Sequence, residues 1–168
     1  MGSLPFLAYP GRGRRLLGQQ AGANCRHDYG LTFARITGIT NCSYCGVDLR
    51  SDYRAWLAVA LDHAVPASVC RDLGIPVNWA NDYANRVLAC SACNSFDNRY
   101  RLTFVVGAPA TLDEFFDLRD KVFQDRVGRI RACHDRERRF YEDNWRDATL
   151  PNPILLHRKS KVVWHKPR

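Results

Sequence analysis

The 168-residue sequence has no apolar run long enough to cross a membrane. Its longest uninterrupted apolar stretch is Ala55–Leu61, far short of the roughly 20 residues that a membrane-spanning helix needs. No sustained apolar segment follows the basic residues near the N-terminus, so we expect no secretory signal peptide. These absences predict a cytoplasmic protein without a membrane partner.

A disulfide framework that pairs every cysteine is excluded, because the seven cysteines are an odd number. In a reducing cytoplasm, closely spaced cysteines favour metal binding over disulfides. Internal repeats and low-complexity tracts are also missing. A hydrophobic content of 46% with 11% aromatic residues indicates a folded chain, and its length allows one domain with a core and an appendage.

Acidic residues are absent from both ends of the chain. Residues 1–27 contain four arginines and residues 151–168 contain five basic residues, and these nine charges exceed the net charge of +8. Basic arms favour a polyanion such as DNA, because neutralising phosphates releases counterions; improved solubility is the alternative explanation. The arm residues that we expect to contact the DNA backbone are Arg12, Arg14, Arg15, Arg158, Lys159, Lys161 and Lys166.

Local patterns predict a mixture of helices and strands. Apolar spacing predicts short helices over residues 29–37 and 67–73, each followed by a glycine. The best strand candidate is residues 55–61, and residues 92–99 are expected to form a helix.

The last third of the chain has a helical period. Thr111 and Glu114 have the spacing of a capping box, and apolar residues then recur at helical intervals as far as Trp145. One long helix or two helices joined near Gly128 both fit this pattern. We expect the helix to pack across the cysteine-rich segment. The pattern is also compatible with a homodimer.

Two C-x-x-C motifs point to a metal site. Cys42 and Cys45 form the first pair, and Cys90 and Cys93 form the second, 44 residues further on. Four thiolates are the ligand set of a structural tetrahedral zinc ion, and Gly46 suits the tight turn after the first pair. A redox-active pair is the alternative for either motif alone, but the expected βαβ surroundings are missing. We therefore predict structural zinc.

A second polar site is indicated between the cysteine pairs. Asp62 and His63 follow the predicted strand directly, and neighbouring side chains of an extended strand point in opposite directions. One of them can therefore bind a metal while the other acts on water. An Asp-His pair alone is weak evidence, but both cysteine pairs enclose this one.

These motifs together resemble the HNH nuclease family, also called the ββα-metal finger. The family pattern is C-x-x-C, then Asp-His-x-x-Pro, then Asn-Leu-x-x-x-C-x-x-C-(His/Asn). The resemblance covers about residues 40–100. The matching segments are Cys42-Ser-Tyr-Cys45, Asp62-His63-Ala-Val-Pro66 and Asn85-Arg-Val-Leu-Ala-Cys90-Ser-Ala-Cys93-Asn94.

The resemblance implies an α+β fold with a treble-clef-like ββα-metal core and a structural zinc ion. The core would cover residues 28–104, between a basic N-terminal arm at 1–27 and a C-terminal helical extension with a basic tail at 105–168.

The implied activity is metal-dependent hydrolysis of DNA phosphodiester bonds. His63 would be the general base that activates water, and Asn85 would brace the loop that orients it. Asp62 and Asn94 would hold one magnesium or manganese ion, for which a carboxylate and an amide oxygen are suitable hard ligands.

The sequence departs from the family at two positions. Asn94 replaces a histidine, which argues against a zinc- or nickel-preferring active site. The lysine that often follows the last motif cysteine is missing, and Arg99 is the nearby residue that we expect at a phosphate. Asn98 is expected one helical turn beyond Asn94.

Two other functions remain as alternatives. A non-catalytic zinc-finger DNA-binding module would keep only the scaffold, and the joint presence of the four polar motif residues argues against it. A redox protein would contain no zinc after purification.

Overall fold

The computed structural model describes Arg26 and residues 29–146 of the chain. It divides the chain into two compact units, the first ending at Cys133 and the second beginning at His134. Outside the described residues lie all of the predicted DNA-contacting arm residues, Arg12, Arg14, Arg15, Arg158, Lys159, Lys161 and Lys166.

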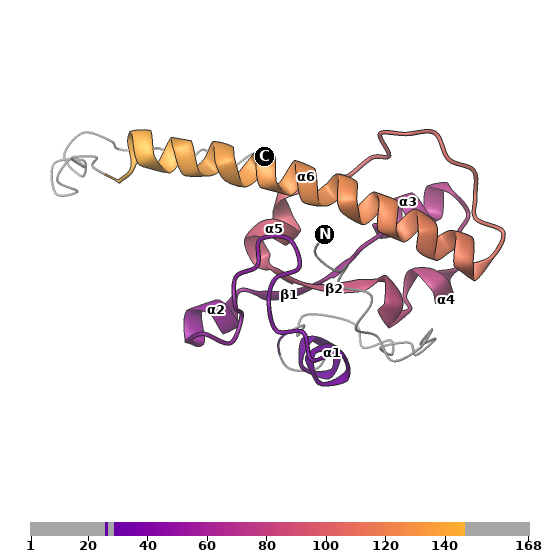
Figure 1. The fold of residues 1–168 in the computed structure, drawn as a ribbon, viewed down its shortest axis with the longest axis horizontal. Coiled ribbons are helices and arrows are strands. Elements are labelled where there is room, and N and C mark those ends of the chain that lie inside the picture. Colours follow the sequence, from indigo (N-terminus) through magenta and orange to yellow (C-terminus); the bar gives the residue numbers. More distant parts are fainter. Residues whose placement is uncertain (1–25, 27–28, 147–168) are drawn as a thin grey trace, which may run out of the picture. The chain divides into compact units, whose positions relative to one another are not determined.

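The chain has a mixed α+β fold in which two antiparallel strands form the sheet. Short helices surround the strands, and one long helix follows them (Figure 1). In chain order the elements are α1 (Tyr29–Thr37), α2 (Tyr53–Leu57), β1 (Val59–His63), α3 (Ala67–Asp72), α4 (Val77–Ala80), the 3-10 turn η2 (Tyr83–Asn85), β2 (Arg86–Cys90), α5 (Ser91–Phe96) and α6 (Leu112–Asn144).

The register of the two strands brings the predicted motifs together. Val59 pairs with Cys90 at one end of the sheet, and His63 pairs with Arg86 at the other. One end of β2 therefore belongs to a C-x-x-C motif, while its other end lies opposite the predicted catalytic histidine.

The strand prediction for residues 55–61 was wrong in its position. The carboxylate of Asp52 accepts hydrogen bonds from the backbone amides of Arg54 (2.7 Å) and Ala55 (2.9 Å) and so caps α2. The cap makes residues 53–57 helical, and the strand begins only at Val59.

The helices predicted over residues 29–37 and 67–73 are confirmed by α1 and α3. Gly74, which follows α3, has a φ of +66°, a value that favours glycine. The helix predicted over 92–99 is shorter than expected, because α5 ends at Phe96. Asn98 therefore lies beyond the helix and not one turn along it from Asn94.

The last predicted helix is a single one, α6, which continues through Gly128. The amide of Glu114 donates to the Thr111 hydroxyl (3.2 Å), and the Glu114 carboxylate accepts from the amide of Ala110 (2.7 Å). These bonds satisfy backbone donors at the start of the helix.

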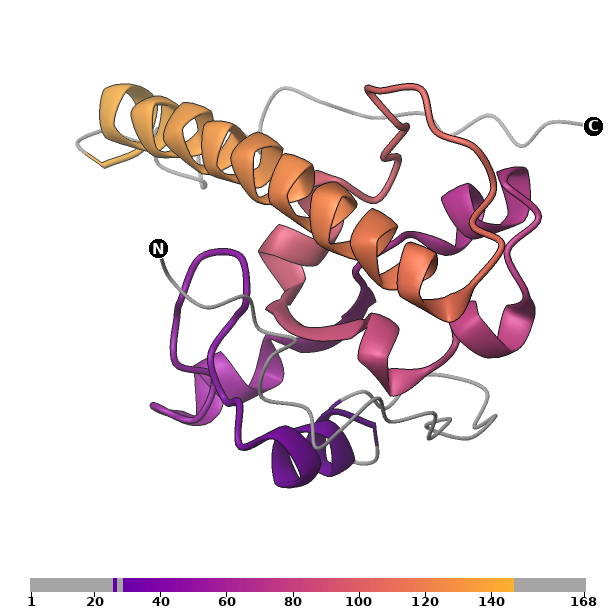
Figure 2. The same ribbon diagram turned by 45° about the vertical axis from the view of Figure 1, so that its right-hand side comes forward.

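The core of the first unit lies on both sides of the two-stranded sheet. The sheet lies between α1 and the residues of α6 up to Cys133, an arrangement that is visible in two views (Figures 1 and 2). The buried apolar stripe of α6 packs into two clusters, and it consists of Phe115, Leu118, Val122, Phe123, Val127 and Ile130. Arg119 and Arg126 are buried in the same stripe.

None of the helices in the described part of the chain is sufficiently long and apolar to span a membrane.

Candidate functional site

The two C-x-x-C motifs meet in space. The Sγ atoms of Cys42, Cys45, Cys90 and Cys93 all lie within 4.8 Å of one another, and those of Cys45 and Cys90 are 3.9 Å apart. A tetrahedral zinc site with Zn–S bonds of about 2.3 Å has sulfur atoms about 3.8 Å apart. The four thiols therefore fit a structural metal ion such as zinc.

Within the described residues, this cluster is also the one group of three or more His, Cys, Asp or Glu side chains that could hold a metal ion.

Backbone hydrogen bonds form the first cysteine turn and attach it to the sheet. The amide of Gly46 donates to the carbonyl of Cys42 (2.8 Å), and Gly46 has a φ of +80°. The amide of Ser43 donates to the carbonyl of Leu88 in β2 (2.8 Å). The first turn is thereby held against the strand that carries Cys90.

The second cysteine turn joins β2 to α5. Cys90 is the last residue of β2, and its sulfur accepts a hydrogen bond from the amide of Cys93 (3.4 Å). Hydrogen bonds from the thiols of Cys90 and Cys93 lower the pKa of Cys42, and bonding to Cys42 raises that of Cys93. The cluster thus favours a thiolate at Cys42, the form in which cysteine binds a metal ion.

Asp62 is held by two donors from distant parts of the chain. The hydroxyl of Tyr44 donates to its Oδ2 (2.7 Å), and Nη2 of Arg126 lies 2.8 Å from the same oxygen. The Asp62 side chain is 13% exposed. Tyr44 lies within the first C-x-x-C motif and Arg126 lies on α6, so Asp62 joins the cysteine turn to the long helix.

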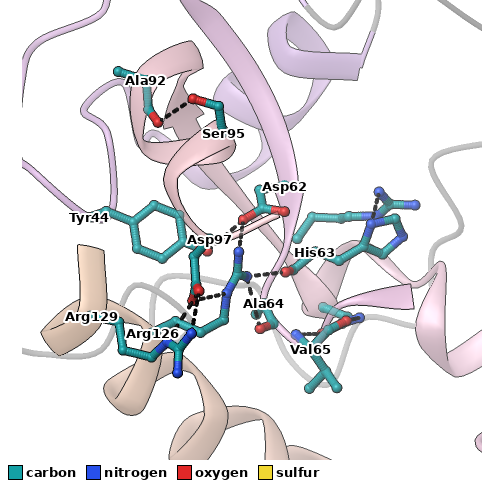
Figure 3. A network of polar contacts seen from close by, with 12 residues as sticks. Tyr44, Asp62, His63, Ala64, Val65, Ala92, Ser95, Asp97, Arg126 and Arg129 are labelled. Carbon is teal, nitrogen blue, oxygen red and sulfur yellow. Dashed lines mark hydrogen bonds and ion pairs between the residues drawn. The ribbon is translucent and has the colours of Figure 1, made fainter. Parts of the chain in front are cut away.

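Arg126 is a buried cation at the centre of this polar network (Figure 3). Its Nη1 donates to the carbonyls of His63 (2.6 Å) and Ala64 (3.2 Å), and its Nε lies 3.5 Å from Asp97. Burial is the largest single effect and lowers the pKa of Arg126, but the charges of Asp62, Tyr44 and Asp97 and the hydrogen bond to Asp62 together outweigh burial and raise that pKa. The guanidinium therefore fixes both the carboxylate of Asp62 and the backbone beyond β1.

His63 contacts a second group of polar side chains. Its Nδ1 lies 3.1 Å from Nη1 of Arg86, and its Nε2 lies 3.3 Å from Oδ1 of Asn81. Because arginine only donates, Nδ1 must accept and Nε2 must carry the proton. Burial, together with the charge of Arg86, lowers the pKa of His63 to about 4, so the imidazole is neutral at pH 7.

Asn85 is fully buried next to the His63 loop. Its amide nitrogen donates to the carbonyls of Val65 (3.1 Å) and Ala80 (2.9 Å), and its Oδ1 accepts from the amide of Val65 (2.9 Å). The side chain ties the segment after His63 to the end of α4. A bracing role would require contacts of this kind.

Asn94 and Arg99 lie further along the chain. Asn94 is partly exposed on α5, which packs against both strands. Arg99 is exposed beyond the end of α5, as is Asn98. The structure thus places Asp62 and Asn94 on neighbouring elements.

Sequence reasoning missed Tyr44, Asn81, Arg86 and Arg126. The position of Arg126 within the apolar stripe of α6 was the one available signal, because a charge at such a position needs a buried partner. Arg86 and Asn81 gave no signal, since their contacts with His63 depend on the strand register and on the fold of the loop between the strands.

The fold and the site define an α+β protein with a four-cysteine cluster that could hold a structural metal such as zinc. The chain matches no protein-family model, and no curated protein or solved structure is significantly similar to it.

Proposed function

We propose that this protein is a metal-dependent endonuclease of the HNH kind, which hydrolyses DNA phosphodiester bonds. The observation that carries the proposal is the position of Asp62 and His63. They are the last two residues of β1, and the paired strand β2 ends at Cys90 of the four-cysteine cluster, directly before α5. Asn81 contacts the imidazole of His63, and Asn85 binds the amide of Val65 just beyond it, which supports a braced histidine next to a carboxylate.

Asp62 and Asn94 are the residues that would hold the catalytic divalent ion. Both contacts that fix Asp62 fall on Oδ2, so Oδ1 is the atom that we expect to face the ion. A carboxylate oxygen and an amide oxygen suit magnesium or manganese. When bound, such an ion supplies positive charge for the phosphate and the leaving oxygen.

His63 would act as the general base. Its Nδ1 carries the lone pair, because Nε2 carries the proton and faces Asn81. Asn81 thereby selects the tautomer, and Asn85 fixes the backbone that follows the histidine. A base held in this way takes the proton of the attacking water.

Plasmid cleavage tests the proposal directly. Zinc-loaded wild type should cleave plasmid DNA with magnesium or manganese, and His63→Ala should reduce the rate about 10²- to 10⁴-fold, the usual contribution of a general base. His134→Ala is the matched control and should cleave at the wild-type rate. Undiminished cleavage by His63→Ala would identify a wrong base or a contaminating nuclease.

A second candidate function is a non-catalytic zinc-containing DNA-binding module. It is favoured by the saturation of the polar site, since Arg126 contacts Asp62 and Arg86 contacts His63. If wild type and His63→Ala both bind plasmid but leave it intact over a range of metals and salt concentrations, this second function replaces the first.

A further inference from the structure

Arg86 holds the imidazole of His63 from across the sheet. The two residues are directly opposed in the register of β1 and β2, and such pairs lie on the same face of a sheet. Nη1 of Arg86 lies 3.1 Å from Nδ1 of His63, and its Nη2 lies 3.1 Å from Oδ1 of Asn81. Arg86 is a partly exposed residue.

This contact occupies the nitrogen that His63 would use as a base. Nδ1 accepts a hydrogen bond from Arg86, while Nε2 carries a proton directed at Asn81. Both ring nitrogens are therefore engaged, and a water molecule can reach the Nδ1 lone pair only when the guanidinium moves away. In this arrangement His63 cannot accept a proton from a water molecule.

A phosphate group is a stronger partner for the Arg86 guanidinium than the side chains of His63 and Asn81. An imidazole nitrogen and an amide oxygen are both neutral, whereas phosphate oxygens are charged and accept roughly twice as strong a hydrogen bond. The planar fork of a guanidinium also matches two phosphate oxygens at once. A phosphate that reaches His63 would thus draw the guanidinium away from Nδ1.

We propose that Arg86 is a phosphate-binding residue that leaves His63 for a backbone phosphate of DNA and so opens Nδ1 to water. This inference rests on the proposed function for the identity of the polyanion. It links the arrival of substrate to the exposure of the base.

The hydrogen bond on Nδ1 can be followed by nitrogen NMR of the full-length, zinc-loaded protein. A duplex oligonucleotide is added without magnesium or manganese, so that binding occurs without cleavage. The Nδ1 resonance of His63 should move toward that of a nitrogen without a donor. Arg86→Met should show this resonance position without DNA, and DNA should then change it little.

Binding and cleavage supply the second readout. Arg86→Met should reduce the salt dependence of DNA binding by about one phosphate contact and the cleavage rate about 10²- to 10³-fold. Arg86→Lys should restore the salt dependence but only part of the rate, because an ammonium group lacks the planar fork. Arg71→Met, at an exposed arginine of α3, is the matched control and should change neither. Zinc content and the unfolding midpoint of each variant report its folding.

The outcomes separate this proposal from the nuclease proposal. If DNA leaves the Nδ1 resonance unchanged and Arg86→Met keeps the wild-type salt dependence, Arg86 binds no phosphate and the inference is overturned, whether or not His63-dependent cleavage occurs. If wild type fails to cleave but DNA shifts the resonance only when Arg86 is present, phosphate binding is supported and the nuclease proposal fails.

Discussion

Substitution of Arg126 should destabilise the protein more than any comparable change on α6. Arg126→Met keeps an apolar stem but removes a guanidinium that lies 2.8 Å from Asp62 and 3.5 Å from Asp97. These carboxylates are 13% and 5% exposed, and the carbonyl of His63 loses a donor. Breaking one side of a buried ion pair costs about 3–5 kcal/mol. We expect about 3 kcal/mol, because Tyr44 and Arg129 still donate to the carboxylates.

Arg119→Met is the matched control for this substitution. Arg119 is also buried on α6, but it donates to the carbonyl of Ala84 (2.9 Å) and pairs with Asp120, whose side chain is 36% exposed. Its loss should cost about 1–2 kcal/mol, the usual range for a lost hydrogen bond. Urea unfolding of the zinc-loaded proteins at pH 7 measures both values, provided that the m-values agree.

A double-mutant cycle isolates the contribution of Asp62. In an Asp62→Asn background the carboxylate is neutral, so Arg126→Met should cost about 1–3 kcal/mol less than in wild type. Equal costs in both backgrounds, or a cost no larger than that of Arg119→Met, would refute the view that charge pairing attaches α6 to the end of β1.

Three further predictions concern the cysteines and the His63 loop. Cys42→Ser, or removal of zinc by a chelator, should abolish the cooperative thermal transition, since binding of a structural metal contributes directly to folding. Asn85→Ala removes the acceptor of the buried Val65 amide and leaves the Val65 carbonyl with only the weak thiol donor of Cys70 (3.7 Å), so it should cost about 2–4 kcal/mol in urea unfolding. Asn98→Ala, at an exposed site, should cost less than about 0.5 kcal/mol. Burial raises the pKa of Cys70 from 9.0 to about 11, so the folded state keeps a proton that the unfolded state loses. The contribution of Cys70 to the free energy of unfolding should therefore be fully present below pH 9 and should fall by up to about 2–3 kcal/mol as the pH rises through 11. Cys70→Ala should reduce this loss of stability at alkaline pH. An unchanged loss would contradict the raised pKa of Cys70.

Sequence patterns predicted those parts of the fold that depend on neighbouring residues. The helix over 29–37 and the capping residues Thr111 and Glu114 follow from local spacing, and both are present. The apolar run 55–61 was assigned wrongly, because a short apolar run fits a helix as well as a strand. The cap at Asp52 decides between them.

The sequence predicted the members of the site better than their contacts. The two C-x-x-C motifs were expected to meet, and they do. The pairing of Asp62 with Arg126 spans 64 positions of the chain, and the pairing of His63 with Arg86 depends on the strand register. Neither kind of contact leaves a local pattern, so tertiary structure was needed to find them.

Cys90 has a consequence for the whole of β2, because it is both a member of the metal cluster and the end of a five-residue strand. A one-residue slip of a strand turns every side chain to the other face, and such a slip would take Arg86 away from His63. A metal ion bound at Cys90 would fix this end of β2 in position and so prevent the slip. Loss of the ion would then allow the contact between Arg86 and His63 at the other end of the strand to be lost, although neither residue is changed.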